Sequence, residues 1–170
     1  MTQIIDRYFL DISSKNKLNL KSKPSDKYSL NKESKNRFDL NKFFYKQIGK
    51  NHHWTDRLQW TDKQWINYVS NPNVFTFVLK EKNNLAGFFE LIHHKNKFEI
   101  EIAYLGLLKE YTEKNLGSYL LTKAIKESFL FKIKRVWVHT CSLDHKNALK
   151  NYLSRGMKIY HTETINIKSA

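Results

Sequence analysis

The segment with the clearest chemical potential is a short turn between an apolar stretch and a helical pattern. Residues 101–121 read EIAYLGLLKEYTEKNLGSYLL. Asn115 and Gly117 tolerate unusual backbone angles, and the N–H groups exposed at the start of a helix attract phosphates, which Gly117 leaves room to approach. With the Lys114 cation, residues 112–118 predict an anion-binding turn. A loop with one glycine before a helix is also a common connection, so this prediction depends on its context.

Two carboxylates share a face of the strand pattern before this turn. In KFEIEIAYLGL (97–107), alternation places Glu99 and Glu101 on one face together with Ala103 and Leu105, opposite Phe98, Ile100, Ile102 and Tyr104. A carboxylate there could take a proton from an amine. Glu101 is our preferred base because it is nearer the turn, and Glu90 on the preceding strand could contribute. A strand glutamate is otherwise commonly a solvent-facing residue.

Other reactive side chains do not form a comparable pattern. Cys141, Asp144 and His145 could suggest a nucleophile with its base, with His139 on the same strand face, but no oxyanion signature accompanies them. The doublets at 52–53 and 93–94 could suggest metal ligands, yet neighbouring histidines point in different directions and no third ligand is suitably spaced. We expect neither a cysteine nucleophile nor a metal.

The surrounding pattern predicts a fold that could position the turn. A polar, basic arm or loop covers residues 13–37, with one strand-like run at 28–30. Helices are expected from Phe38 to the stop at Gly49, and over residues 63–70 after a Thr61-Asp62 cap. Later elements are strands at 74–81, 85–94 and 97–107, a helix from Gly117, a strand at 135–141, a helix from Asp144 whose inner face holds His145, Ala148, Leu149, Tyr152 and Leu153, and a closing strand or strands. We therefore predict an α/β (α+β) fold, a single domain over residues 1–170 with a mixed, mostly antiparallel sheet.

Composition limits the classes of function. The chain of 170 residues is 41% hydrophobic and has no long apolar run, so we expect one packed core, no membrane span and, without a signal peptide, a cytoplasmic protein. The lone cysteine, Cys141, agrees with a reducing compartment. The net charge of +14 could favour nucleic acid, but 25 of the 30 basic residues are lysine. Because bidentate phosphate recognition favours arginine, a nucleic-acid partner is not the preferred hypothesis.

Two segments together resemble the GNAT acetyltransferase superfamily. Residues 101–121 resemble its acetyl-CoA signature, a strand followed by an Arg/Gln-x-x-Gly-x-Gly/Ala turn and a helix. Gly117 matches, whereas Thr112 and Asn115 replace the usual Arg/Gln and first glycine. Residues 135–162 resemble its later strand and helix, where Ala148, Tyr152 and Gly156 match, His145 replaces an asparagine and Met157 a phenylalanine. The resemblance extends over about 73–168.

The resemblance implies that an amine attacks the acetyl-CoA thioester directly. It implies a co-substrate site formed by Leu105, Gly106, Leu107, Thr112, Glu113, Lys114, Asn115, Leu116, Gly117, Ser118, His145 and Ala148. It also implies that Tyr152 is the general acid for the CoA thiolate, although a tyrosine anchoring its helix is the alternative. The aromatic-rich segment 51–65 falls where the family's variable helices cover the acceptor, so Trp54, Arg57, Trp60 and Glu90 are candidate substrate contacts. The same tryptophans could equally be buried as core.

Three functions remain open at this point. The leading hypothesis is an N-acetyltransferase that acts on a small-molecule or peptide amine. The alternatives are an inactive acyl-CoA-binding sensor, because Thr112, Asn115 and His145 depart from the pattern, and a basic RNA-associated module. A homodimer is compatible with the sequence, which does not identify the acceptor.

Overall fold

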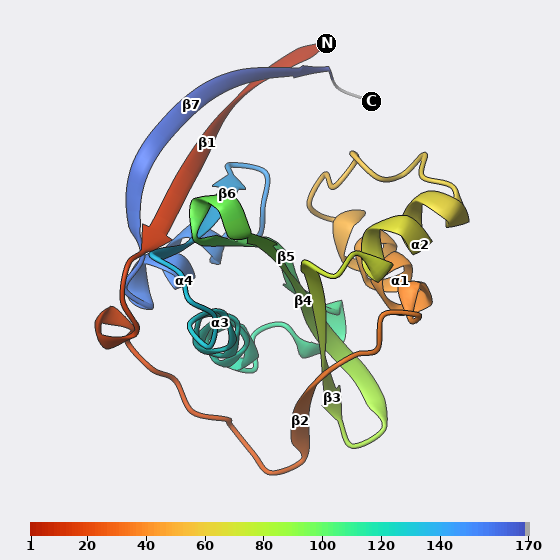
Figure 1. The fold of residues 1–170 in the computed structure, drawn as a ribbon. Helices are drawn as coiled ribbons and strands as arrows, with labels where there is room; N and C mark the ends of the chain where they lie inside the picture. Colours follow the sequence, from red (N-terminus) through yellow and green to blue (C-terminus); the bar gives the residue numbers. More distant parts are fainter. Residues whose placement is uncertain (169–170) are drawn as a thin grey trace.

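The computed structural model describes residues 1–168 and contains one mixed sheet with the strand order β2-β3-β4-β5-β6-β1-β7 (Figure 1). The α+β fold class is confirmed. The strands are β1 (Thr2–Ile12), β2 (Tyr28–Lys32), β3 (Val74–Glu81), β4 (Asn84–His94), β5 (Glu99–Leu107), β6 (Arg135–Cys141) and β7 (Lys158–Lys168). The helices are α1 (Phe38–Gly49), α2 (Asp62–Ser70), α3 (Leu116–Ser128) and α4 (Ala148–Ser154).

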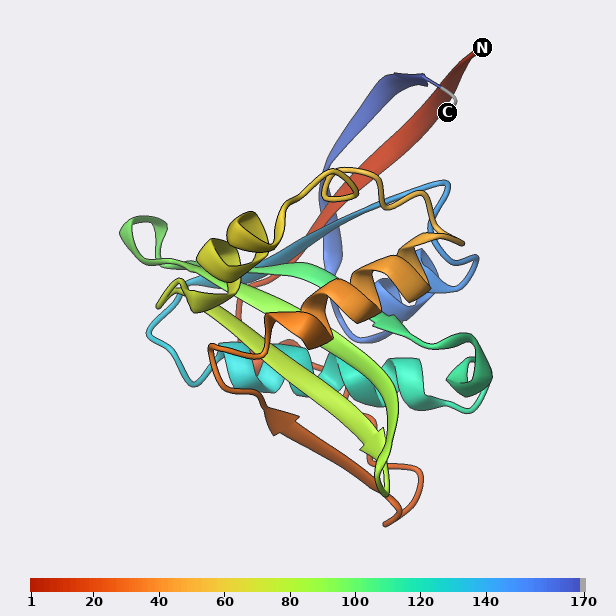
Figure 2. The ribbon, with the colours of Figure 1, turned by 90° about the vertical axis from the view of Figure 1, so that its right-hand side faces the viewer.

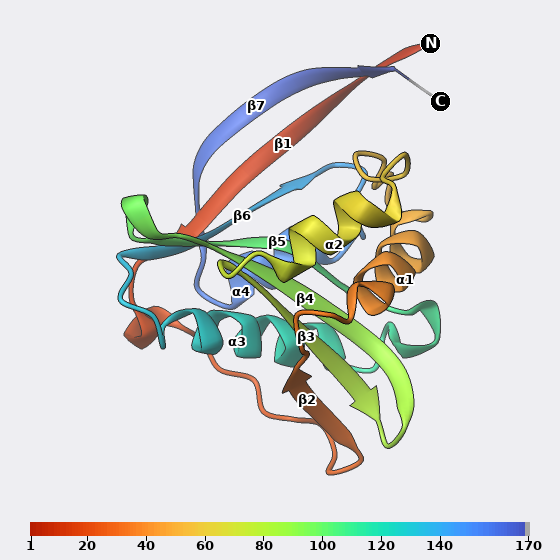
Figure 3. The same ribbon diagram turned by 45° about the vertical axis from the view of Figure 1, so that its right-hand side comes forward.

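Helices cover both faces of the sheet. Figure 3 shows α1 and α2 on one side and α3 on the other, while Figure 2 shows α1 and α3 on either side of β3 and β4. Apolar side chains of α3, such as Leu120 and Ile125, are fully buried against the sheet. A smaller cluster lies under α1, where Phe44 stacks on Phe88 with ring centroids 4.9 Å apart. The expected capping of α2 is confirmed by a reciprocal box between Thr61 and Gln64.

The first strand was not expected from sequence. β1 lies between β6 and β7 and pairs antiparallel with both. It pairs with β7 from Thr2 to Asp11, and the far part of this ribbon extends away from the rest of the sheet (Figure 1). The segment's charges at Asp6, Arg7 and Asp11 interrupt its apolar residues, which concealed the strand pattern. Its pairing partners are more than 120 residues away in sequence, so no local signal indicated them.

A bulge corrects the predicted faces of β5. The register between β4 and β5 shifts between Glu90 and Leu91, which pair with Tyr104 and Ile102. The extra residue, Ala103, reverses the alternation beyond it. Ile102 faces the α3 core, but so does Leu105, whereas Tyr104 packs under α1. The prediction that Tyr104 shares a face with Ile102 was therefore wrong.

The pairing of β5 with β6 opens the sheet. These strands are parallel and are in register only from Glu99–Arg135 to Glu101–Trp137. Both strands continue beyond this point, β5 to Leu107 and β6 to Cys141. Since they no longer pair there, their C-terminal halves leave a gap in the sheet. Within residues 1–168, none of the helices combines the length and apolar character needed to span a membrane.

Candidate functional site

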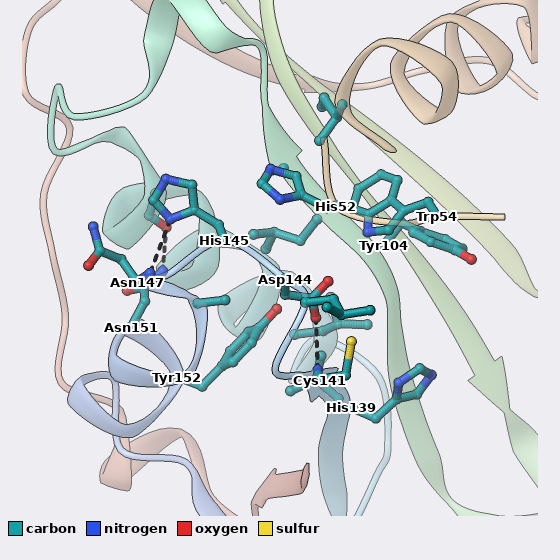
Figure 4. A pocket seen from close by; sticks show the side chains of 18 of the residues that line it. His52, Trp54, Tyr104, His139, Cys141, Asp144, His145, Asn147, Asn151 and Tyr152 are labelled. Carbon is teal, nitrogen blue, oxygen red and sulfur yellow. Dashed lines mark hydrogen bonds between the residues drawn. The ribbon is translucent and has the colours of Figure 1, made fainter. Parts of the chain in front are cut away.

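A cavity of about 740 Å³ lies where β5 and β6 separate. Its walls come from the end of β5, the turn before α3, the end of β6 with α4, and the loop between α1 and α2, with further residues from β1, β7 and the segment between β1 and β2. Figure 4 shows side chains from these elements directed into the cavity. The gap in the sheet therefore exposes polar backbone as well as side chains to one enclosed space.

The predicted anion-binding turn has the required backbone geometry. Asn115 is left-handed with φ 60° and ψ 20° and precedes the first residue of α3, and Glu113 is also left-handed with φ 64°. Gly117 lies in the first turn of the helix, and a Cβ there would meet only ordinary contacts, 3.8 Å from Asn151 Nδ2 and 3.9 Å from Leu107 Cδ1. The fold itself does not demand this glycine. A glycine weakens a helix relative to alanine, so its presence is consistent with a ligand that approaches closely.

Most of the predicted co-substrate residues line this cavity. They are Leu105, Gly106, Leu107, Thr112, Glu113, Asn115, Gly117, Ser118, His145 and Ala148. Two residues of the predicted set do not line it. Leu116 is fully buried in the core, and Lys114 lies with Nζ 5.5 Å from the centre of the Tyr111 ring. Gly106 also has a packing role, because a Cβ there would lie 2.8 Å from Ile48.

Tyr152 lies on α4 and contributes to the cavity wall. Its side chain is 7% exposed and packs with the α3 core, and its hydroxyl end points toward the middle of the cavity in Figure 4. Burial, supported by the charge of Asp144, raises the pKa of Tyr152 well above its ordinary value. The phenol therefore keeps its proton at neutral pH and can donate a hydrogen bond.

The helix that carries Tyr152 begins later than predicted. α4 starts at Ala148, so His145 precedes it, and Leu153 is 45% exposed rather than on the inner face. Asp144 closes the turn after β6 instead of capping the helix. Its carboxylate accepts hydrogen bonds from the Cys141 N–H at 3.0 Å and from the Thr140 hydroxyl. Because the Asp144 carboxylate binds the backbone of this turn, it does not cap a helix at residue 145, and α4 begins later.

The two predicted acidic contacts have other partners. Glu101 does not line the cavity, and its Oε1 lies 3.0 Å from His94 Nε2. Glu90 is fully buried and accepts a hydrogen bond from Arg57 Nη1 at 2.9 Å. The Tyr68 hydroxyl donates to the same carboxylate at 2.7 Å. Glu90 and Arg57 thus form an internal ion pair outside the cavity lining.

The aromatic segment divides between core and cavity. Trp54 lines the cavity and packs on Tyr104 with centroids 4.7 Å apart. Trp60 does not line it and packs edge-on against Trp65, which is buried. Of the four candidate acceptor contacts, only Trp54 reaches the cavity, together with its neighbour Asp56.

His139, which the sequence analysis considered only beside Cys141, is one of the cavity residues. It lies on β6, lines the edge of the cavity, and packs on Phe9 of β1 with centroids 5.6 Å apart. Desolvation by neighbouring atoms lowers the pKa of His139 below its ordinary value, although the residue stays partly exposed; the charge of Arg7 acts in the same direction and that of Glu101 in the opposite one. The neutral imidazole can accept a proton. Alternation along residues 135–141 was the available signal, but it could not show that this face opens into a cavity.

Comparison with known proteins supports one family. Residues 37–157 match the Acetyltransferase (GNAT) family. Among curated proteins, no significant match to this sequence was found.

Several solved structures share the fold. An aminoglycoside acetyltransferase from an uncultured soil metagenomic sample, solved in complex with trehalose, aligns with a TM-score of 0.65 and 14% identity, over 78% of this chain and 90% of that one. A GCN5-related N-acetyltransferase from Sphaerobacter thermophilus aligns with a TM-score of 0.72 and 12% identity, over 96% of this chain. The present chain covers 51% of that protein's length. At these identities the likeness concerns the fold.

Proposed function

Because the chain belongs to the acetyltransferase (GNAT) family, we propose that it transfers an acetyl group from acetyl-CoA to a primary amine. The observation that carries this proposal is the single cavity between the separated ends of β5 and β6, which joins the left-handed turn before α3 to Tyr152. A thioester could lie in this gap with its phosphates at the helix N-terminus. This arrangement requires the turn before α3 and Tyr152 to line the same cavity.

The residues around the gap fit acetyl-CoA. The backbone of β5 at Leu105 and Leu107 lacks a β6 partner, so its free polar groups could bind the pantetheine amides and polarise the acetyl carbonyl. The N–H groups near Asn115 and Gly117 would hold the pyrophosphate. Bound acetyl-CoA supplies an activated acetyl thioester. The side-chain contribution usual in the family at position 112 falls to Thr112, whose hydroxyl instead donates to the Lys109 carbonyl at 2.8 Å.

Two cavity residues are suited to the proton transfers. His139 is neutral at physiological pH and lines the edge of the cavity, so it can remove the proton from the attacking amine. Tyr152 retains its proton and can donate it toward the departing sulfur. Glu101, our base from sequence, contributes as a nearby negative charge that stabilises the His139 imidazolium. Asp144 and Asp56 add charge of the same sign.

The acceptor side favours a cationic amine. Trp54 offers an aromatic face and Asp56 a carboxylate in the same loop, and both line the cavity. These groups would bind an ammonium ion by charge and by contact with the ring. An aminoglycoside acetyltransferase among the structures of similar fold is compatible with a polyamine-like acceptor.

The test combines binding with turnover. Acetyl-CoA should raise the melting temperature in proportion to its excess over Kd, and an amine panel that includes polyamines and aminoglycosides should release free CoA. Equal stabilisation by ATP or NADH would remove the basis for the co-substrate assignment. Tight acetyl-CoA binding with no CoA release from any amine would indicate a sensor rather than an enzyme.

A further inference from the structure

Arg155, a buried arginine, lines the cavity and has two guanidinium nitrogens without a hydrogen-bond partner within residues 1–168. Arg155 directly follows α4, is 4% exposed and lines the cavity. Its Nε and Nη1 atoms are buried and have no hydrogen-bond partner among the described residues. A buried charge without a partner destabilises a fold. The arrangement therefore indicates that an anion completes this site.

The side chain of Arg155 is shielded from water, and no carboxylate in the described part of the chain offsets the loss of hydration of its charge. Burial lowers the pKa of Arg155 from its ordinary value, as expected for a cation removed from water without a carboxylate beside it. Among residues 1–168, the other buried arginine is Arg57, which differs because it is paired with Glu90. The protein therefore supplies a carboxylate to one buried arginine, Arg57, and leaves the one that lines the cavity, Arg155, without such a partner there.

The polar segment between β1 and β2 supplies a second cation at this place. Lys21 lines the cavity, and its backbone N–H donates to Thr122 Oγ1 of α3 at 3.1 Å. The Asn19 N–H donates to the Arg155 carbonyl at 2.9 Å. The segment is thus fixed against both α3 and α4. It brings Lys21 to the same wall as Arg155.

This wall adjoins the anion-binding turn. Asn151 Nδ2 donates to the Gly117 carbonyl at 3.0 Å, which fixes α4 against the start of α3. Arg155 follows Asn151 by four residues, and its N–H donates to the Asn151 carbonyl, so it lies about one helical turn, roughly 5–6 Å, farther along. Two anion-binding positions therefore lie side by side in one cavity.

We propose that Arg155, assisted by Lys21, binds the ribose 3′-phosphate of coenzyme A. This inference rests on the proposed function, in which the turn at residues 113–118 holds the pyrophosphate. Coenzyme A carries its two anionic groups on either side of one ribose, which matches two neighbouring cation-rich positions. The guanidinium suits this task because it offers several donors in a fixed plane and binds phosphate in a bidentate manner.

The experiment compares coenzyme A with 3′-dephospho-coenzyme A by isothermal titration calorimetry. The wild-type protein should bind coenzyme A about 10- to 100-fold more tightly, the range expected for charge-assisted hydrogen bonds. Arg155→Met keeps the length of the side chain and removes its charge, so it should abolish this preference while affinity for the dephospho form stays within a few-fold. Lys158→Met is the control for net charge, because Lys158 is exposed on β7 and does not line the cavity.

The outcomes separate this inference from the proposed function. If wild-type protein binds both forms equally, the 3′-phosphate site is wrong while the co-substrate assignment stands. A preference that persists in Arg155→Met also overturns the inference, since another group then binds the phosphate. If neither form binds, both proposals fail. Comparison of the two ligands on wild-type protein remains decisive even if the variant does not fold.

Discussion

The two proposed binding sides of the cavity are built in different ways. On the co-substrate side, the turn at residues 112–118 offers backbone N–H groups, shaped by a left-handed Asn115 and by Gly117. On the acceptor side, Trp54 and His139 come from a loop and a strand that lie more than 80 residues apart in sequence. A site made of local backbone leaves a pattern in the sequence. A site assembled by tertiary packing of side chains does not.

The largest expected effect is on the acceptor side. His139→Asn removes the proton acceptor but keeps a polar side chain of similar size, so kcat/KM with a good amine should fall by about 10²- to 10⁴-fold. Acetyl-CoA affinity should stay within a few-fold, because the change lies away from the turn. The matched control is Glu101→Gln, which should cost far less activity. A larger loss in Glu101→Gln than in His139→Asn would restore Glu101 as the base.

The pH dependence of kcat/KM also tests whether His139 is the base. Because the pKa of His139 is lowered, the imidazole stays neutral and competent down to a pH below the ordinary histidine range. As pH falls through this lowered pKa, protonation removes the base, and kcat/KM should drop about tenfold per pH unit. A profile of kcat/KM from about pH 4.5 to 8.5, about two units either side of an ordinary histidine pKa, tests this limb. The limb should be absent in His139→Asn.

A third prediction separates the acceptor side from the core beside it. Arg57→Met leaves the Glu90 carboxylate buried without its ion pair, so the free energy of unfolding should fall by about 3–5 kcal/mol. Chemical denaturation measures this change, and the double variant with Glu90→Leu should recover part of it. If stability is unchanged while KM for the amine rises, Arg57 contacts substrate as the sequence suggested.

The success of the sequence-based predictions also differs between local features and features that depend on tertiary packing. Local signals predicted α1, α2, β3, β4 and the turn at residues 112–118, because these elements begin and end at caps, glycines and short polar turns. β1 was missed because its partners are distant. The faces of β5 beyond Ala103 were mistaken because a bulge inserts one residue without changing composition. The missing partner of Arg155 depends on burial, which no sequence pattern records.

On the leaving-group side, Tyr152→Phe should slow acetyl transfer by about 10²-fold, near the lower end of the range for a general acid. The thiolate is already a fairly stable leaving group, so the proton contributes less than it would to an alkoxide. The ring keeps its packing, and acetyl-CoA affinity should stay within a few-fold. The measurement is kcat beside a direct titration. An unchanged kcat, with chemistry shown to limit the rate, would make Tyr152 a helix anchor.

The smallest expected effect concerns the glycine of the turn and has opposite signs for stability and binding. Gly117→Ala should raise the free energy of unfolding of the ligand-free protein by up to about 1 kcal/mol, because alanine favours the helix and its Cβ meets only ordinary contacts. The same methyl group would stand in the path of the phosphates and should weaken acetyl-CoA binding by about tenfold, near 1.4 kcal/mol. Thermal unfolding without ligand and a titration with acetyl-CoA measure the two terms separately. Ser128→Ala, at the other end of α3 and away from the cavity, controls for a general change in the helix. A more stable variant that binds acetyl-CoA as tightly as the wild type would show that the phosphates do not approach the backbone at Gly117, and the co-substrate side would then depend on side chains as the acceptor side does.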